Sequence, residues 1–169
     1  MSVESTALPL KQPGDYRAII WGGLGAGVLD ITAAIVTTAI RSGRGPLVVL
    51  QSVASGLLGA NSYKGGFPAA ALGLAIHFFN AFVICTIFFL ASRKLTFLTK
   101  NWIIFGVLYG IGVYFVMYGI VLRLTFQRNF LTPFSSVMLN MAIHIVCVGL
   151  PIAFAVHHFS KPGEENRQD

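Results

Sequence analysis

The chain has 169 residues, of which 55% are hydrophobic and only 11% are charged. Because an ordinary soluble domain carries roughly 25% charged residues, this composition predicts an integral membrane protein, built as one domain over residues 1–169. The net charge of +6 would suit nucleic acid, but the lysines and arginines lie at the ends of apolar runs, where they meet lipid headgroups. The expected partner is therefore the lipid bilayer and not nucleic acid.

The first apolar run, residues 18–40, is long enough to cross a hydrocarbon core of about 30 Å and contains one charged residue, Asp30. Helical spacing places three small residues on the same side of this helix as Asp30, namely Gly23, Gly27 and Ala34. A ridge of small residues faces other helices and not lipid. The carboxyl group of Asp30 is therefore predicted to point into the protein.

The segment 46–60 is apolar but too short to span a membrane, because it would reach only about 22 Å as a helix. Its leucines and valines fall on one side, while Gln51, Ser52 and Ser55 fall on the other. This pattern is typical of an amphipathic helix at the membrane interface. We expect a short helix over residues 46–60 that lies on the membrane surface or re-enters the membrane.

Three further apolar runs, residues 67–91, 102–124 and 136–156, are each long enough to form a transmembrane helix. In the second of these runs, Gly106 and Gly110 have the GxxxG spacing that is typical of close helix packing. Four spans place both termini on one side of the membrane, and that side carries slightly more lysine and arginine, which predicts cytoplasmic termini. The expected fold is an all-α, four-helix membrane bundle.

A weak internal repeat relates the first two spans to the last two. Residues 19–30 resemble residues 103–114, and the triplet Ala-Ile-His at 75–77 recurs at 142–144. The two offsets differ by about the length of the segment 46–60, as expected if one hairpin gained that segment. The pattern favours two hairpins related by duplication, with chance similarity between apolar spans as the alternative.

One polar residue in each span lies at a similar depth. Counted at about 1.5 Å per residue from the same membrane surface, these residues lie roughly 12 to 15 Å deep. They are Asp30, His77, Tyr114 and His144. An unpaired carboxylate at that depth is costly, so the four groups are expected to pair, to lose their charge or to line a wet cavity. We expect Asp30 to bond or ion-pair with His77, and the other two residues to complete a ring.

The polar layer allows two main interpretations of function. In the first, the layer binds a small solute or relays protons within the membrane. The candidate binding or proton-relay residues are Asp30, His77, Asn80, Tyr114, Asn140 and His144. In the second, the protein is an accessory or structural subunit, as a homo-oligomer or beside a partner membrane subunit, and the same groups only specify helix pairing.

Cofactor binding is a third and less favoured interpretation. His77 and His144 could be the axial ligands of a haem b between the second and fourth spans. Asp30 could join the two histidines as a ligand of zinc, but no HExxH motif or cysteine pair accompanies them. We therefore expect no resident cofactor, no metal and no catalytic residue, and a protein other than an enzyme is favoured.

Four stretches of the sequence resemble small bacterial inner-membrane proteins of uncharacterised function. These stretches are GGLGAGVLDI, LQSVASGLLGANSYKGG, LGLAIHFF and NMAIHIVCVGLPIAFAV. The resemblance implies four membrane spans and a location in the bacterial plasma membrane. It implies no activity, cofactor or catalytic residue.

Overall fold

The computed structural model describes residues 15–122 and 133–159, and within these ranges the chain is almost entirely helical and has no strand. Four helical segments are long and apolar enough to cross a membrane, judged by length and composition. They are Tyr16–Ser42, Gly66–Lys94, Trp102–Val121 and Phe134–Phe159. The prediction of an all-α chain with four potential spans is therefore confirmed. Residues 123–124 of the third predicted span lie outside the described residues.

The first half of the chain forms two long helices joined by a short one. The elements in order are α1 (Asp15–Ser42), α2 (Pro46–Leu58), the 3-10 helix η1 (Gly59–Lys64) and α3 (Gly66–Lys94). Pro46 begins α2 at a position where no backbone N–H is needed, and Gly59, with a φ of 58°, ends it. The short helix predicted over residues 46–60 is therefore present and ends at Leu58.

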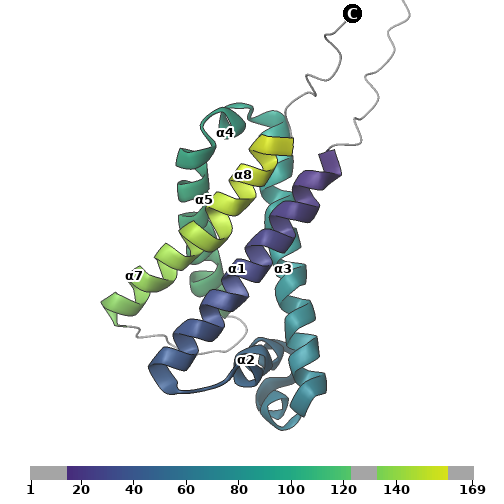
Figure 1. Cartoon of the computed structure of the whole chain (residues 1–169), viewed down its shortest axis with the longest axis vertical. Coiled ribbons are helices and arrows are strands. Elements are labelled where there is room, and N and C mark those ends of the chain that lie inside the picture. The colour runs from purple at the N-terminus through teal and green to yellow at the C-terminus, as the bar shows by residue number, and fades with distance from the viewer. Residues whose placement is uncertain (1–14, 123–132, 160–169) are drawn as a thin grey trace, which may run out of the picture.

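Helix α2 packs across α3 near the end of the molecule where α1 ends. In Figure 1, α2 is seen almost end-on, whereas α3 runs along the length of the molecule. Gly73 permits this contact, because a Cβ there would lie 2.8 Å from the carbonyl carbon of Leu50 and 3.2 Å from the backbone nitrogen of Ala54. The position of α2 on or in a membrane stays a prediction.

The second half of the chain contains the other two potential spans. Its elements in order are α4 (Phe97–Lys100), α5 (Trp102–Val116), the π-helix η2 (Met117–Val121), α7 (Phe134–Ile143), the π-helix η3 (His144–Gly149) and α8 (Leu150–Phe159). Successive spans run in opposite directions, so α1 begins and α8 ends at the same end of the molecule (Figure 1). We call this end the terminal end, and the opposite end, where α2 lies, the α2 end.

The two π-helices interrupt the last two spans, and the periodicity of the sequence does not indicate them. In a π-helix each backbone N–H bonds the carbonyl five residues back, one residue further than in an α-helix. At the end of η3 the N–H of Leu150 bonds the carbonyl of Ile145 in this way. Pro151, which has no N–H and is expected to kink the helix, follows immediately. The π-helix η3 therefore ends just before Pro151, the residue that interrupts regular α-helical hydrogen bonding.

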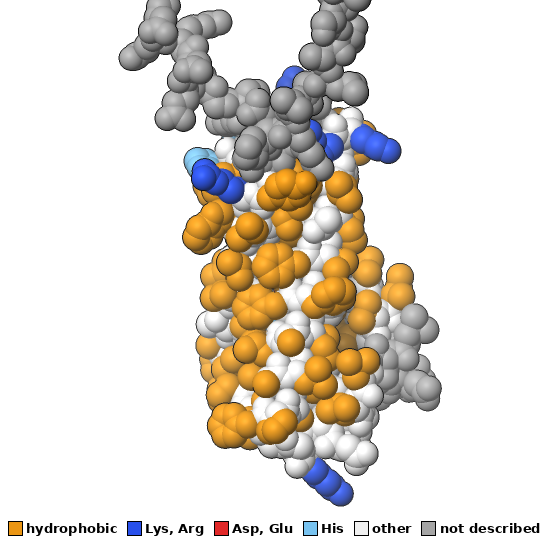
Figure 2. All heavy atoms as spheres, turned by 90° about the vertical axis from the view of Figure 1, so that its right-hand side faces the viewer, with side chains coloured by type: hydrophobic (Ala, Val, Ile, Leu, Met, Phe, Trp, Pro, Cys, Tyr) orange, Lys and Arg blue, Asp and Glu red, His pale blue; other side chains and the backbone are white. Residues whose placement is uncertain are grey.

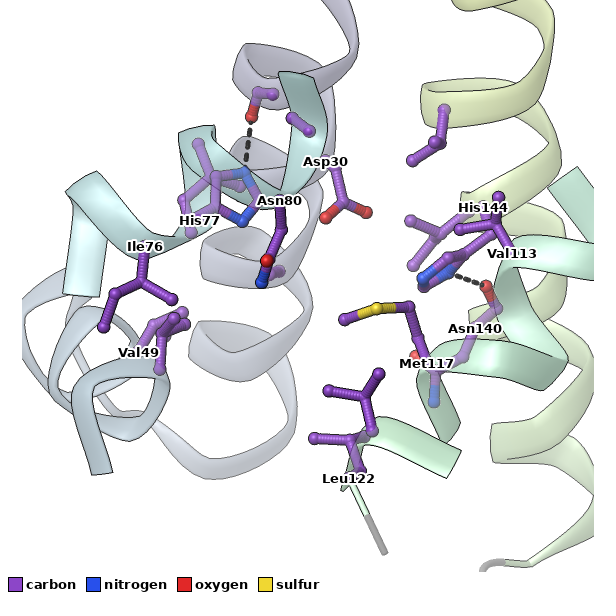
Figure 3. A pocket seen from close by; sticks show the side chains of 18 of the residues that line it. Asp30, Val49, Ile76, His77, Asn80, Val113, Met117, Leu122, Asn140 and His144 are labelled. Carbon is purple, nitrogen blue, oxygen red and sulfur yellow. Dashed lines mark hydrogen bonds between the residues drawn. The ribbon is translucent and has the colours of Figure 1, made fainter. Parts of the chain in front are cut away.

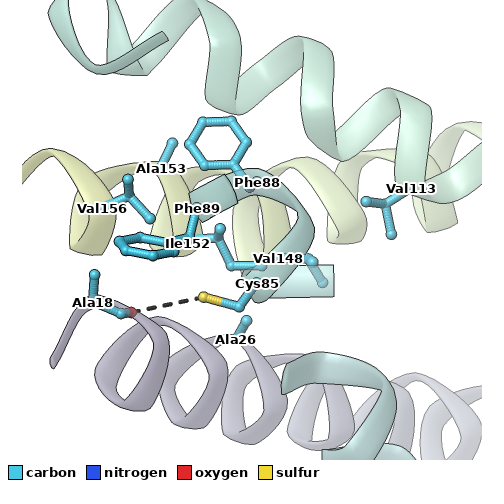
Figure 4. Close-up of a cluster of buried hydrophobic side chains, with 10 residues drawn as sticks. All are labelled: Ala18, Ala26, Cys85, Phe88, Phe89, Val113, Val148, Ile152, Ala153 and Val156. Atoms are coloured by element: carbon cyan, nitrogen blue, oxygen red, sulfur yellow. Dashed lines mark hydrogen bonds between the residues drawn. The ribbon is translucent and has the colours of Figure 1, made fainter. Parts of the chain in front are cut away.

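A closely packed core fills the terminal end between α1, α3 and α8 (Figure 4). Cys85, Ile152 and Val156 are completely buried there. The thiol of Cys85 lies 3.7 Å from the carbonyl oxygen of Ala18, to which it donates. Small side chains on α1 and α8 let bulky side chains of α3 enter between the helices, so this end of the molecule is filled.

The outer surface is apolar along the length of the spans. Figure 2 shows hydrophobic side chains over one face of the molecule, with lysine and arginine at its two ends. Large side chains such as Ile40 and Phe67 are 80% and 81% exposed. Because soluble monomers rarely expose such continuous apolar surface, this face suits contact with lipid.

Glycines bring α5 into backbone contact with the last span. A Cβ on Gly110 would lie 2.6 Å from the Cα of Ile145 and 2.8 Å from the carbonyl oxygen of His144. A Cβ on Gly149 would lie 2.7 Å from the backbone nitrogen of Gly110. The GxxxG pair that begins at Gly106 therefore packs against the fourth span of the same chain.

Replacing Gly110 by alanine should destabilise the protein, because the new Cβ would force α5 and η3 apart. We expect a loss of about 1 to 3 kcal/mol in the free energy of unfolding, the range for overpacked interiors. Gly112→Ala is the matched control, since a Cβ on Gly112 meets no atom within 4 Å and alanine favours a helix. Thermal unfolding in detergent measures both variants, and equal melting temperatures would contradict the close contact at Gly110.

Candidate functional site

A cavity of about 490 Å³ lies in the half of the molecule nearer the α2 end. Its walls come from α1, α2 and α3 on one side and from α5, η2, α7 and η3 on the other (Figure 3). Val113 and Val148 belong to the packed core and also line the cavity, so the core forms its floor. The volume lies within the range of roughly 300 to 1,000 Å³ that is typical of small-molecule sites.

Every predicted site residue except Tyr114 lines this cavity. The lining residues among them are Asp30, His77, Asn80, Asn140 and His144. The first three come from α1 and α3, the last two come from α7 and η3, and Figure 3 shows the two groups on opposite sides of one space. Three of the four residues that helical rise places at one depth, Asp30, His77 and His144, therefore also meet around one cavity.

His77 is held by the backbone of α1. Its Nε2 lies 2.9 Å from the carbonyl oxygen of Gly27, and because a carbonyl oxygen can only accept, Nε2 carries the donated hydrogen. The neutral imidazole therefore keeps Nδ1 as an acceptor. Gly27 also permits the close approach of the two helices, since a Cβ there would lie 2.7 Å from a ring carbon of Phe78.

The predicted bond or ion pair between Asp30 and His77 is not formed, and that prediction is wrong. His77 donates instead to the carbonyl of Gly27, one helical turn before Asp30 on the same side of α1. Where α1 carries glycine, its backbone is open to a ring from α3. Helical spacing predicts which side of α1 the ring meets, but it does not distinguish a backbone acceptor from a side-chain acceptor one turn away.

His144 is held by its own helix. Its Nδ1 lies 2.8 Å from the carbonyl oxygen of Asn140 and donates to it, because the carbonyl can only accept. Nε2 is then the acceptor of the neutral ring. Figure 3 shows the ring of His144 reaching toward the cavity from the side opposite His77. Each histidine therefore uses one nitrogen on backbone and keeps one acceptor nitrogen.

Tyr118, rather than Tyr114, lines the cavity. Tyr114 is only 5% exposed and stacks on Tyr118 with ring centroids 4.7 Å apart. Both tyrosine rings meet the ring of His144 edge-on, each at a centroid distance of 5.8 Å. Residues four apart share one side of a helix, so the sequence contains a signal for Tyr118. The depth calculation selects Tyr114 instead, but Tyr114 is buried against Tyr118 and does not line the cavity.

Asp30 is half-buried in the cavity wall and makes no hydrogen bond or salt bridge within residues 15–122 and 133–159. It is close enough to Tyr118 and Cys147 to interact electrostatically with both. Figure 3 shows the carboxylate pointing into the space between His77 and His144. The carboxylate is therefore open to whatever occupies the cavity.

The cavity wall contains no lysine or arginine in the described part of the chain. Arg41, at the α2 end of α1, donates through Nη2 to the hydroxyl of Ser136 at 2.9 Å and so ties α1 to the start of α7. Its guanidinium is not among the groups that line the cavity. Asp30 therefore has no lysine or arginine beside it among the described residues of the cavity wall.

Helix α2 contributes a wall that the sequence does not predict. Ser52 and Gly56 line the cavity together with apolar side chains of the same helix, among them Val49 and Val53. An amphipathic pattern predicts that one side of a helix avoids water, but it does not say whether that side meets lipid or protein. Here the helix faces α3 and the cavity.

Metal binding by the predicted residues gains no support from their placement. Among the residues that the structure describes, no group of three or more histidine, cysteine, aspartate or glutamate side chains is placed to hold a metal ion. Asp30, His77 and His144 therefore share a cavity without forming a metal site there. Haem binding by the two histidines stays a prediction.

Comparison with known proteins finds no match for this chain. No protein-family model, no curated protein and no solved structure matches the chain. The resemblance to small bacterial inner-membrane proteins therefore stays a prediction, and the cavity itself is the basis for any functional assignment.

Substitutions at Asp30 and His77 should differ in their effect on stability. Asp30→Leu should leave the melting temperature unchanged or raise it, because the carboxylate has no bonding partner in the described residues and is costly at membrane depth. His77→Leu should lower the free energy of unfolding by about 1 kcal/mol, the typical value of one hydrogen bond. Thermal unfolding in detergent measures both variants. Equal losses would show that the carboxylate is paired after all.

Proposed function

We propose that this protein is a multi-pass protein of the bacterial plasma membrane, in which the four spans form one bundle of two hairpins. The packing of α1 on α3, and of α5 on η3 and α8, supports this arrangement. Basic residues such as Arg93, Lys94 and Lys100 gather at the terminal end, which supports cytoplasmic termini. The α2 end then faces the periplasm.

The proposed function is the binding of a small solute in the cavity, as a step in its passage through the membrane. The observation that carries this proposal is the carboxylate of Asp30, which faces a cavity of about 490 Å³ and bonds no described residue. An ionisable group at membrane depth is a functional candidate by default. Asn80 and Asn140 add amide groups that can hydrogen-bond a solute.

The packed core limits how a solute could pass. Val113 and Val148 separate the cavity from the terminal end, where α1, α3 and α8 are closely packed. Passage would require these helices to move apart. A binding site near the middle of the spans with one closed side is the arrangement expected of one state in alternating access.

A purely structural role would be favoured if the polar groups bonded one another and filled the space between the helices. Instead, His77 and His144 bond backbone carbonyls, and Asp30 bonds no side chain that the structure describes. The space left between them favours solute binding over an accessory role.

Cysteine labelling tests whether the cavity is wet and accessible. In a background where Cys85 and Cys147 are replaced by alanine, Ala34→Cys should react rapidly with a small, charged, water-soluble thiosulfonate. Ala34 lines the cavity one turn from Asp30, and thiolates form and react in water rather than in lipid. Reaction rates in proteoliposomes give the measurement.

Thr32→Cys is the matched control for this labelling, because Thr32 is exposed on the outer side of the same helix and does not line the cavity. It should react far more slowly, since its surroundings are lipid. Equally slow reaction at both positions would mean that the polar layer is packed shut, and would favour the accessory role.

Reporter fusions test the proposed orientation. Alkaline phosphatase inserted within residues 61–66 should be active, because this connection would lie in the periplasm. The same enzyme fused after Asp169 should be inactive, and a fluorescent protein fused there should fold in the cytoplasm. A periplasmic signal from the carboxyl terminus would contradict the four-span arrangement with cytoplasmic termini.

A further inference from the structure

We propose, on the basis of the proposed function, that the cavity takes a protonated organic amine, a monovalent cation with N–H donors at one end and an apolar body. Three features of the cavity support this class of ligand. They are the charge of its wall, the hydrogen-bonding groups that remain open in it, and the apolar surface that makes up most of its lining.

The charge of the cavity wall favours a ligand with one positive charge. Asp30 is the only acidic residue among the described residues that line the cavity, and no lysine or arginine lines it. Its carboxylate interacts electrostatically with Tyr118 and Cys147, neither of which carries a positive charge, while Arg41 acts on Tyr118 from outside the cavity lining. A bound monovalent cation would therefore supply the counter-charge that the cavity wall lacks.

The acceptor atoms in the cavity wall that bond no described group favour a ligand with hydrogen-bond donors. Nε2 of His77 and Nδ1 of His144 both donate to backbone carbonyls, so the nitrogen that each neutral ring keeps open is an acceptor. When ionised, the carboxylate of Asp30 also only accepts. An ammonium group with two or three N–H bonds matches these acceptors. The two asparagine amides that line the cavity can donate as well as accept, but a carboxylate or phosphate would be repelled by the ionised carboxylate and would leave the histidine acceptors unpaired.

The remaining lining calls for an apolar body. Side chains such as Val49, Ile76, Met117 and Leu122 surround the polar groups on both sides of the cavity (Figure 3). Met117 is flexible and polarisable and can adapt to ligands of different shape. An inorganic cation would leave most of the 490 Å³ unfilled by the ligand. A carbon skeleton joined to the ammonium group fills the cavity and removes apolar surface from water.

The test uses three probes that share one skeleton and differ in charge and in N–H donors. 2-Phenylethylammonium has the charge and the N–H donors, its N,N,N-trimethyl derivative has the charge alone, and 2-phenylethanol has neither the charge nor the N–H donors. Isothermal titration calorimetry on the full chain in phosphatidylcholine nanodiscs, with empty nanodiscs as the blank, measures each affinity.

We expect 2-phenylethylammonium to bind most tightly to the unmodified protein. Loss of a hydrogen bond to a charged group typically corresponds to about 10- to 100-fold in affinity, so the alcohol should bind that much more weakly. The trimethyl derivative should also bind more weakly than the primary ammonium, because it cannot donate to His77 Nδ1 or His144 Nε2.

Asp30→Asn tests the role of the charge, and Thr32→Val is the control variant on the outer side of the same helix. Asp30→Asn should remove the preference for the ammonium over the alcohol while the alcohol still binds, and Thr32→Val should keep the preference. Because Asp30 bonds no described residue, Asp30→Asn is expected to fold.

Several outcomes would overturn this inference. Equal affinities for alcohol and ammonium in the unmodified protein would show that the cavity binds solutes without selecting a cation. This result would contradict the proposed class of ligand but not the proposed function. Equal affinities for the primary and trimethyl cations would remove the role of the histidine acceptors. Binding of no probe above the empty nanodiscs would exclude this class of ligand, whatever the labelling of Ala34→Cys shows.

Discussion

Gly110 and Gly149 bring the backbones of α5 and the last span so close that neither position has room for a Cβ. On the other side of the molecule, Gly23 and Gly27 let the rings of Phe82 and Phe78 approach the backbone of α1. Helices that meet this closely at one level must diverge beyond it unless they are parallel. Figure 1 shows the spans spreading toward the α2 end. The cavity and the position of α2 both follow from this divergence.

The same close contacts determine the chemistry of the cavity. Because α1 presents backbone to α3, His77 bonds a carbonyl and leaves Asp30 without a partner among the described residues. Because His144 bonds the carbonyl of Asn140 on its own helix, it too cannot neutralise the carboxylate without losing that bond or gaining a proton. The carboxylate and the two histidines are therefore held apart around a space and do not form a closed network among the described residues.

Helical rise and hydropathy are sufficient to predict the four potential spans and the short helix after the first of them. They also place Asp30, His77 and His144, which all line one cavity, at similar positions along their helices. These features depend only on distances along one helix. The partner of His77, the choice of Tyr118 over Tyr114 and the part played by α2 depend on how neighbouring helices are rotated and tilted. A sequence pattern indicates the side of a helix on which a residue lies, but it does not indicate which atom of a neighbouring helix the residue contacts. For this reason the partner of His77, the choice of Tyr118 and the part played by α2 could not be predicted from the sequence.

The π-helices have a consequence for how the cavity can change shape. Met117, Tyr118, His144 and Val148 all lie within η2 or η3 and all line the cavity. A π-helix contains one residue more than the α-helical turn it replaces, and this surplus can move along a helix by exchanging one set of backbone bonds for the next. Each step rotates the residues it passes by about 100° while both ends of the helix stay in place. An internal change of register in the last two helical spans would thus exchange the side chains that face the cavity without displacing the connections at either end.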